Sequence, residues 1–319
     1  MNLNELHSRD FADALPPRLT RDGVSPSSVV LPVGPWTTLR EFLLQRFPGV
    51  SEAAWVARFE KGEVLDESGV AVPANLPYAA GQRIHYYRSI EAEARIPFDE
   101  VVLFQDELLV VADKPHFLPV IPSGRYLQET LLVRLKRRLG LDSLSPIHRI
   151  DRETAGLVVF TVQPATRGRY QNLFLEKSIR KGYEAIAPWR PELELPLNHR
   201  SRLEENPERF MQMREVAGEP NAETRIERLE IHGKWARYGL NPITGRKHQL
   251  RAHCAALGIP IRNDQIYPVH LPENSDDFGQ PLQLLAKHIA FADPISGEAR
   301  RFASARALEW PVVARDAAP

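Results

Sequence analysis

The order of strand-like and helical segments is the feature that most constrains the fold of this 319-residue chain. Short apolar runs typical of strands outnumber segments with helical spacing, and the two kinds rarely alternate one for one. A doubly wound fold needs that alternation, so we predict an α+β fold with a mixed, largely antiparallel sheet. The expected strands are 101–104, 108–111, 157–161, 179–187, 225–231, 235–240, 286–291 and 299–302, and the expected helices of this body are 129–139, 164–176 and 246–257.

Proline and glycine residues, which interrupt helices and strands, help to divide the chain into three regions. Residues 1–35 are rich in proline and are expected to form an N-terminal arm. Residues 36–90 contain two short helices, capped by Thr38 and by Ser51, followed by small strands. This order resembles an S4-type RNA-binding module. The module is degenerate here, because acidic neighbours offset Arg58 and Lys61 on its second helix. Residues 97–310 form the main body.

Composition excludes several classes of protein. A hydrophobic fraction of 43% excludes a disordered chain, and no apolar run is long enough to span a membrane. Cys254 is the single cysteine, so no intrachain disulfide can form, and the N-terminus lacks a secretory pattern. We therefore expect a cytoplasmic protein.

Positive charge is concentrated although the net charge is zero. Residues 125–190 hold 13 basic and 6 acidic side chains, and residues 244–262 hold four basic side chains and no acidic one. These two blocks form one basic face if they meet in space. The alternative is that they are ordinary solvated helix faces.

The segment His-Arg-Ile-Asp-Arg-Glu-Thr-Ala-Gly at 148–156 places Asp151 in a loop before an apolar strand. Arg149 and Arg152 flank this carboxylate, and opposite charges favour the ionised form. Such an aspartate is a candidate nucleophile or electrostatic anchor. The alternative is a structural ion pair, with Thr154 capping a turn.

Two further segments carry candidate residues. In the strand predicted at 179–187, Lys181 and Tyr183 face the same side, so the cation can position the phenol. At 244–254, Thr244 and Gly245 are expected to open a helix whose first turns carry three basic side chains, a suitable phosphate site: Arg246, Lys247 and His248. No metal site is expected, because His248 and His253 are five residues apart and lack the glutamate of the helical zinc motif. Cys254 is expected in the core.

These segments together closely resemble the RluA-type pseudouridine synthases. The sequences HRIDRETAGLVVF, RKGYEAI and TGRKHQLRAHCAALGIPIRNDQIY occur in the order of that family, and the loop containing Lys114 and Pro115 matches another of its motifs. The resemblance covers residues 98–302. It implies a catalytic domain of pseudouridine synthase type over 97–310, and an accessory S4-like unit is common in the family.

The resemblance implies isomerisation of uridine to pseudouridine in structured RNA, either rRNA or tRNA, without cofactor or metal and by a monomer. Asp151 matches the catalytic aspartate, Tyr183 the active-site tyrosine and Arg251 the basic partner of the aspartate. Arg149 matches the arginine that replaces the extruded uridine in the stack. The other residues expected to bind RNA are Arg152, Lys181, Arg246, Lys247 and His248.

The chain departs from the family pattern at residues 263–268, where both glycines of the motif GDxxYG are lost, and at 284–286, where Leu-Leu-Ala replaces Leu-His-Ala. Two alternatives remain. A non-catalytic RNA-binding protein would share the basic face. A carboxylate-dependent glycosidase or nucleosidase would need a second carboxylate about 5–10 Å from the first, for which Asp264 and Glu153 are the candidates.

Overall fold

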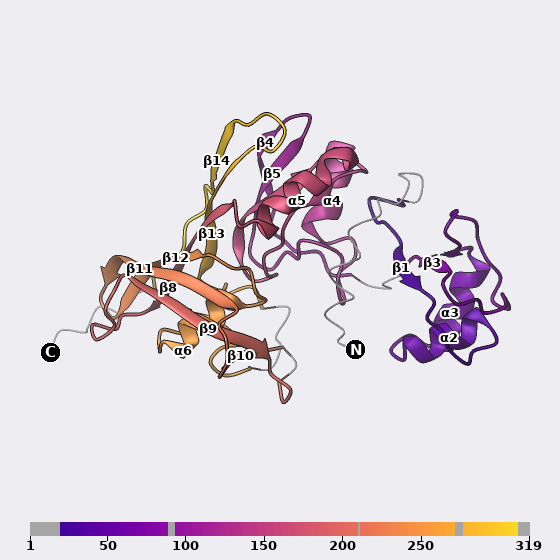
Figure 1. Cartoon of the computed structure of the whole chain (residues 1–319), viewed down its shortest axis with the longest axis horizontal. Coiled ribbons are helices and arrows are strands. Elements are labelled where there is room, and N and C mark those ends of the chain that lie inside the picture. Colours follow the sequence, from indigo (N-terminus) through magenta and orange to yellow (C-terminus); the bar gives the residue numbers. More distant parts are fainter. Residues whose placement is uncertain (1–19, 89–92, 210, 272–276, 312–319) are drawn as a thin grey trace. The chain divides into compact units, whose positions relative to one another are not determined.

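The computed structural model describes residues 20–88, 93–209, 211–271 and 277–311 (Figure 1). The chain forms two compact units. The first comprises residues 1–94, 122–128 and 133–143, and the second comprises residues 95–121, 129–132 and 144–319. Most of the predicted N-terminal arm, residues 1–19, lies outside the described residues. The S4-like interpretation of 36–90 stays a prediction.

The first unit contains a three-stranded antiparallel sheet in the order β1–β3–β2, formed by β1 (Ser27–Val30), β2 (Val64–Leu65) and β3 (Arg83–Tyr86). Its helices are α2 (Leu39–Arg46), α3 (Glu52–Glu60) and most of α4 (Leu131–Leu139), of which residues 133–139 belong to this unit. The Thr38 side chain accepts a hydrogen bond from the Glu41 backbone and caps α2, and Ser51 caps α3. These caps satisfy amide groups that would otherwise lack partners, which explains where the two helices begin.

The second unit is built on one 11-stranded sheet in the order β10–β9–β11–β12–β8–β13–β7–β5–β4, with β14 beside β13 and β6 beside β7. All neighbouring pairs are antiparallel except β13 with β7, which is parallel. The predicted fold class is therefore confirmed. The strands are β4 (Val101–Gln105), β5 (Leu109–Lys114), β6 (Ser145–Pro146), β7 (Ala155–Thr161), β8 (Arg180–Pro188), β9 (Leu197–Glu205), β10 (Met213–Val216), β11 (Ala222–His232), β12 (Trp235–Pro242), β13 (Leu284–Ala292) and β14 (Ala299–Ala303).

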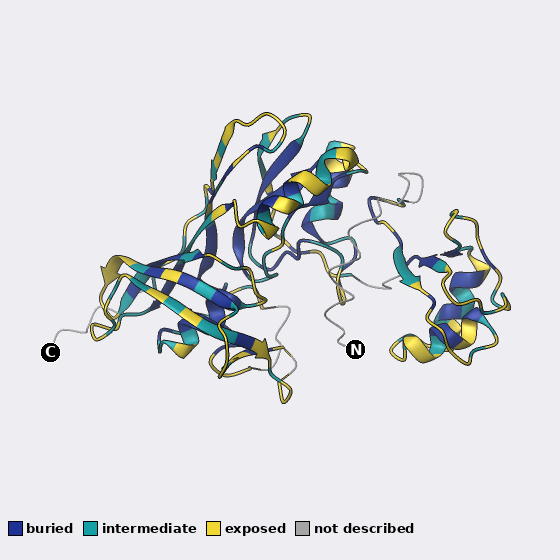
Figure 2. Ribbon diagram, in the orientation of Figure 1, coloured by how far each residue is buried: buried dark blue, intermediate teal, exposed yellow. Residues whose placement is uncertain are grey.

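Few helices accompany the sheet in the second unit, namely the 3-10 turn η2 (Pro164–Thr166), α5 (Arg167–Leu175) and α6 (Gln249–Ala256). Tyr170 and Leu173 of α5 join a cluster with the buried residues of β5 and β7. Strand β7 is buried along its whole length (Figure 2). Among the described residues, no helix is long and apolar enough to cross a membrane.

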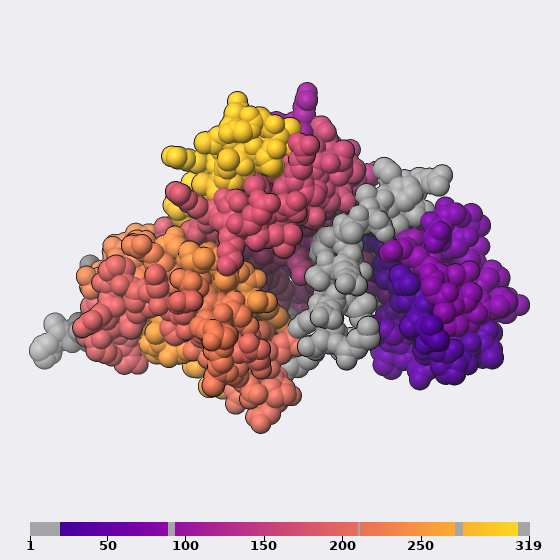
Figure 3. Space-filling view, viewed as in Figure 1, coloured from indigo at the N-terminus to yellow at the C-terminus, as the bar shows by residue number. Residues whose placement is uncertain are grey.

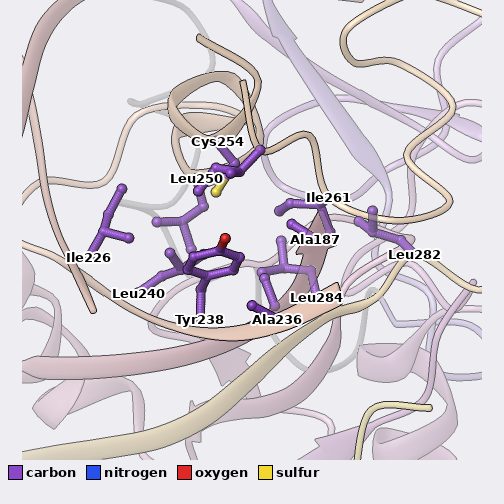
Figure 4. Packing of buried hydrophobic residues seen from close by; sticks show 12 residues of the cluster. Ala187, Ile226, Ala236, Tyr238, Leu240, Leu250, Cys254, Ile261, Leu282 and Leu284 are labelled. Carbon is purple, nitrogen blue, oxygen red and sulfur yellow. The ribbon is translucent and has the colours of Figure 1, made fainter. Parts of the chain in front are cut away.

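Helix α6 packs on the other part of the sheet. Figure 4 shows Leu250 and Cys254 of this helix beside the ring of Tyr238 on β12, in a cluster that includes buried residues of β8 and β11. Cys254 is buried, as expected for a core residue. This packing fixes the face of α6 that carries Leu250 and Cys254, and thereby the direction of the polar residues between them.

The predicted start of this helix at residue 246 is wrong. The helix begins at Gln249, and His248 precedes it in the left-handed conformation with φ of 52°. The Gln249 side chain accepts hydrogen bonds from the Arg246 amide (3.0 Å) and the Thr244 hydroxyl (2.7 Å). Residues 244–248 are thus a loop tied to the first residue of the helix, so the basic side chains of 246–248 do not lie on a helical N-terminal turn.

Candidate active site

Asp151 lies in the loop 147–154 that joins β6 to β7, as the sequence predicts. The two strands are antiparallel neighbours, so the loop reverses the direction of the chain between them. The Ile147 amide donates to the Val159 carbonyl (3.0 Å), and the Thr154 amide donates to the Asp151 carbonyl (3.2 Å). A short loop held at both ends by a buried strand gives the carboxylate a fixed place at the end of β7.

Arg251 of α6 is the closest cationic partner of this carboxylate. Its Nη1 donates to Oδ2 of Asp151 at 3.2 Å, and its side chain is 1% exposed while that of Asp151 is 29% exposed. The same guanidinium makes a two-pronged contact with Asp264, through Nε at 2.8 Å and Nη2 at 2.7 Å. Asp264 in turn accepts from the amides of Ile266 (2.8 Å) and Tyr267 (3.0 Å). Arg251 is therefore clamped in place by Asp264 and offers its remaining nitrogen to Asp151.

His248 lies on the other side of the carboxylate, with its Nε2 3.9 Å from Oδ1 of Asp151. Burial raises the pKa of Asp151, but His248 and Arg251 outweigh it, so the pKa is lowered overall. Burial also lowers the pKa of His248, which leaves this ring mainly neutral near pH 7. Arg251, whose pKa is raised by Asp264 and Asp151 against its burial, is the group that keeps the Asp151 carboxylate ionised at neutral pH.

Arg149 and Arg152 flank Asp151 in the sequence, and each has its own surroundings. Arg152 pairs with Glu153 at 3.2 Å and donates to the Phe117 carbonyl at 3.2 Å, so its guanidinium contacts the neighbouring residue and the loop after β5. Arg149 is exposed as a whole residue. Partial burial of its guanidinium lowers its pKa, and the charge of Asp151 opposes that shift. The geometric partner of Asp151 is Arg251, 100 residues further along the chain.

Lys114 links the loop that carries Asp151 to the loop after β5 through hydrogen bonds to backbone carbonyls. Its side chain is completely buried at the end of β5, and its Nζ donates to three backbone carbonyls: Pro115 (3.0 Å), Leu118 (2.7 Å) and Arg152 (3.0 Å). Burial lowers its pKa to about 7. These bonds tie the residue after Asp151 to the loop after β5, which restricts movement of the loop 147–154.

Tyr183 lies on β8, half-buried against the core cluster beneath α6. Burial and the nearby Asp151 charge both raise its pKa, so the phenol stays protonated at neutral pH. Strand β8 pairs with β12 and β13 at the centre of the sheet, which makes it a rigid support. The charge of the Asp151 carboxylate thus favours the protonated form of the Tyr183 phenol.

Four basic side chains line a cavity of about 690 Å³ in the second unit, between α5, β8 and the loop 243–246: Lys177, Lys181, Arg200 and Arg246. Lys181 and Arg246 are among the residues that the sequence predicts to bind RNA. Lys177 and Arg200, which line the same cavity, are not among them. Asp151 does not line this cavity, but β8 connects the two places, with Lys181 at the cavity and Tyr183 two residues further on. The salmon and orange segments of β9 to β12 are contiguous on the face shown in Figure 3.

Lys247 and His248 are separated from this cavity. Lys247 Nζ lies 3.8 Å from Glu205, and His248 faces Asp151. Sequence reasoning missed Asp264 as the residue that orients Arg251. From the sequence, the segment 263–268 differs from the family motif by its missing glycines, and Asp264 is a candidate only for a second hydrolytic carboxylate.

Comparison with known proteins places this geometry in a family. The model of the RNA pseudouridylate synthase family matches residues 108–256, a segment that contains Asp151, Tyr183 and Arg251. An uncharacterized RNA pseudouridine synthase of Synechocystis is 32% identical over 251 residues, which cover 73% of this chain and 81% of the relative. The dual-specificity RNA pseudouridine synthase RluA of Haemophilus influenzae is 31% identical over 63% of this chain and 90% of the relative.

A solved structure agrees at the level of the fold. The human RNA pseudouridylate synthase domain containing 1 superposes with a TM-score of 0.54 and 21% identity, over 66% of this chain and 85% of that one. The sequence similarity and the shared fold lead to one conclusion: the chain belongs to the RluA-type family of RNA pseudouridine synthases, isomerases that convert uridine in RNA to pseudouridine.

Proposed function

We propose that Asp151 is the catalytic carboxylate of this isomerisation and acts on a uridine that has been flipped out of structured RNA. The observation that supports this best is the chain of contacts from Asp264 through Arg251 to Asp151, with distances of 2.7–2.8 Å and 3.2 Å. It supplies an ionised carboxylate, partly open to solvent and fixed in direction. A glycosidic bond inside a duplex is out of reach of any side chain, so the base must leave the stack first.

The reaction breaks the bond from C1′ to N1 of uracil and forms a bond from C1′ to C5. Attack of Asp151 on C1′, attack on C6 of the base, and assistance of a glycal intermediate all begin with an anionic aspartate. Tyr183 packs against the extruded base and holds or moves a proton through its phenol. Arg149, exposed beside Asp151, fills the stack that the uridine has left.

The RNA backbone passes over the basic cavity. Lys181 and Arg246 contact phosphates there, and Arg152, Lys247 and His248 contribute contacts nearer the catalytic loop. Four cations and one carboxylate, Glu223, line the cavity, and Glu223 pairs with Arg200 at 3.6 Å. The excess of positive charge suits a polyanion, because each neutralised phosphate releases condensed counterions. The substrate is rRNA or tRNA. The enzyme works as a monomer in the cytoplasm, where its single buried cysteine stays reduced, and the isomerisation requires no cofactor.

The test is a pair of isosteric variants assayed on RNA. Asp151→Asn keeps the shape of the side chain and removes its charge, so it abolishes formation of pseudouridine while leaving RNA affinity and folding intact. Asp99→Asn makes the same chemical change at an exposed position and serves as the matched control. Retention of even a tenth of the wild-type rate by Asp151→Asn overturns the catalytic role of Asp151.

A hydrolase is disfavoured by the other carboxylates of the site. A second catalytic carboxyl must be free to carry or accept a proton. Asp264 uses both oxygens in its contact with Arg251 and in backbone hydrogen bonds, and Glu153 pairs with Arg152. Release of free uracil from RNA in the same assay would favour the hydrolase instead.

A further inference from the structure

A second cluster of side chains lies between the sheet and α6. His199 of β9, Glu215 of β10 and His253 of α6 each contribute one atom to a group whose members lie within 4.8 Å of one another. His199 Nε2 is 2.7 Å and His253 Nε2 is 4.0 Å from Oε1 of Glu215. Within the part of the chain that the structure describes, no other group of three such residues is as close.

Two hydrogen bonds hold the ring of His253 between β9 and β11. Its side chain is completely buried, with Nδ1 3.0 Å from the Thr224 hydroxyl and Nε2 3.2 Å from the Ser201 hydroxyl. A proton on Nδ1 that is donated to Thr224 leaves Nε2 unprotonated, with its lone pair accepting from the Ser201 hydroxyl, and a metal ion at Nε2 takes the place of that hydrogen bond. Ligating histidines commonly make such a hydrogen bond through the second ring nitrogen. Burial lowers the pKa of His253 to about 4, so the ring is neutral at physiological pH.

We propose that His199, Glu215 and His253 form a binding site for one Zn²⁺ ion. Two imidazole nitrogens and one carboxylate oxygen are a donor set that zinc accepts, whereas magnesium and calcium prefer oxygen ligands only. Ligands about 2.0–2.2 Å from a tetrahedral ion lie roughly 3.3–3.5 Å apart. The two separations from Glu215, 2.7 and 4.0 Å, lie on either side of that value, so each changes by less than about 1 Å on zinc binding, and all three ligand atoms lie within 4.8 Å of one another before it.

Access and protonation are compatible with this site. The side chains of His199 and Glu215 are 19% and 28% exposed, which leaves room for water as the fourth ligand. The Nε2 proton that His199 donates to Glu215 must move to Nδ1 or to solvent when zinc takes its place. The bound ion joins β9 and β10 to α6, and therefore acts as a structural clamp on the helix that carries Arg251.

The experiment uses the full chain without an affinity tag, treated with EDTA, dialysed and titrated with ZnCl₂ by calorimetry. We expect one Zn²⁺ per chain and a rise in melting temperature on addition of zinc, because a ligand that binds only the folded state stabilises it. His199→Gln and Glu215→Gln each weaken zinc binding at least tenfold. Both change partly exposed strand positions and leave the buried His253 in place, and circular dichroism checks that they fold.

The matched control is His232→Gln, an exposed histidine at the end of β11 outside the cluster, which keeps the wild-type affinity. Co²⁺ gives a second readout, because tetrahedral coordination by nitrogen and oxygen produces visible absorption bands that His199→Gln loses. The proposal is overturned if the wild-type protein binds no stoichiometric zinc, if His199→Gln and Glu215→Gln bind it as tightly as the wild type, or if Mg²⁺ stabilises the protein equally.

Discussion

The charge of one carboxylate decides what this site can do. Asp151 is partly buried, which alone would favour its neutral form, yet the nearby cations lower its pKa below the ordinary value. A depressed pKa in the folded state means that the interaction stabilises the protein above the unfolded pKa of aspartate. That contribution is lost as the pH falls through the lower folded value. The acid limb of the pH–rate profile therefore lies below the ordinary range of aspartate.

Substitution of Arg251 tests this arrangement. Arg251→Ala removes the permanent cation, so the pKa of Asp151 rises and the acid limb of the rate profile moves to higher pH. It also leaves Asp264 buried without its partner, which destabilises the fold by about 3–5 kcal/mol. Arg251→Lys recovers part of both properties, because an ammonium cannot reproduce the two-pronged contact. Single-turnover rates across pH and urea unfolding measure these effects, and an unchanged acid limb in Arg251→Ala would contradict the assigned role.

At the scale of elements, the loop 147–154 that carries Asp151 leads directly into the parallel pairing of β7 with β13. Gly156, two residues after Thr154, has φ of +111°, and a Cβ atom there would lie 2.3 Å from the Ala286 carbonyl oxygen. Only glycine allows this approach of the two backbones. The glycine of the sequence motif is therefore explained by strand packing next to the loop that carries Asp151.

A pair of glycine substitutions tests that explanation. Gly156→Ala forces β13 away from β7 and destabilises the protein by on the order of 3 kcal/mol, with loss of activity. Gly168→Ala is the control, because an added Cβ in α5 meets nothing and a helical alanine stabilises by about 0.5–1 kcal/mol. Urea unfolding measures both variants. Equal stability of Gly156→Ala and wild type would show that the strands can separate without cost.

Most of the sheet could be predicted from the sequence, because strands such as β5 and β7 are largely apolar runs between turn residues. Strand β9 could not, because its inward face alternates leucines with His199 and Ser201 and therefore lacks an apolar pattern. The start of α6 was misplaced because the Gln249 side chain replaces a helical turn with a loop. The contact of Arg251 with Asp264 depends on a tertiary fold that local patterns do not encode.

For the molecule as a whole, the zero net charge conceals an uneven distribution. The basic cavity belongs to the second unit, whereas in the first unit Arg58 is buried against the ring of Trp55 and offers little to a partner. The placement of four cations around one cavity, and not the charge of the unit as a whole, predicts that the second unit provides most of the affinity for RNA. Five basic side chains of the block 125–190 belong to the first unit, namely Arg125, Arg134, Lys136, Arg137 and Arg138.

The salt dependence of RNA binding tests this division. Lys181→Ala and Arg246→Ala each reduce the slope of log K against log salt by about one, as expected for a phosphate contact. Lys61→Ala, an exposed lysine of the first unit, leaves the slope unchanged, as does Lys234→Ala in the β11–β12 turn. Binding isotherms at several salt concentrations give these slopes. If Lys61→Ala lowers the slope and the cavity variants do not, the first unit is the main RNA anchor.

The most direct test of the central claim is pseudouridine mapping of total RNA from cells that lack the gene and are complemented with wild-type protein or with Asp151→Asn. If Asp151 drives uridine isomerisation, one or a few positions in rRNA or tRNA lose pseudouridine in the deletion strain. The wild-type protein restores them, and an equally abundant Asp151→Asn protein does not. Restoration of the same positions by Asp151→Asn, or an RNA pseudouridine profile unchanged by the deletion, would contradict that claim.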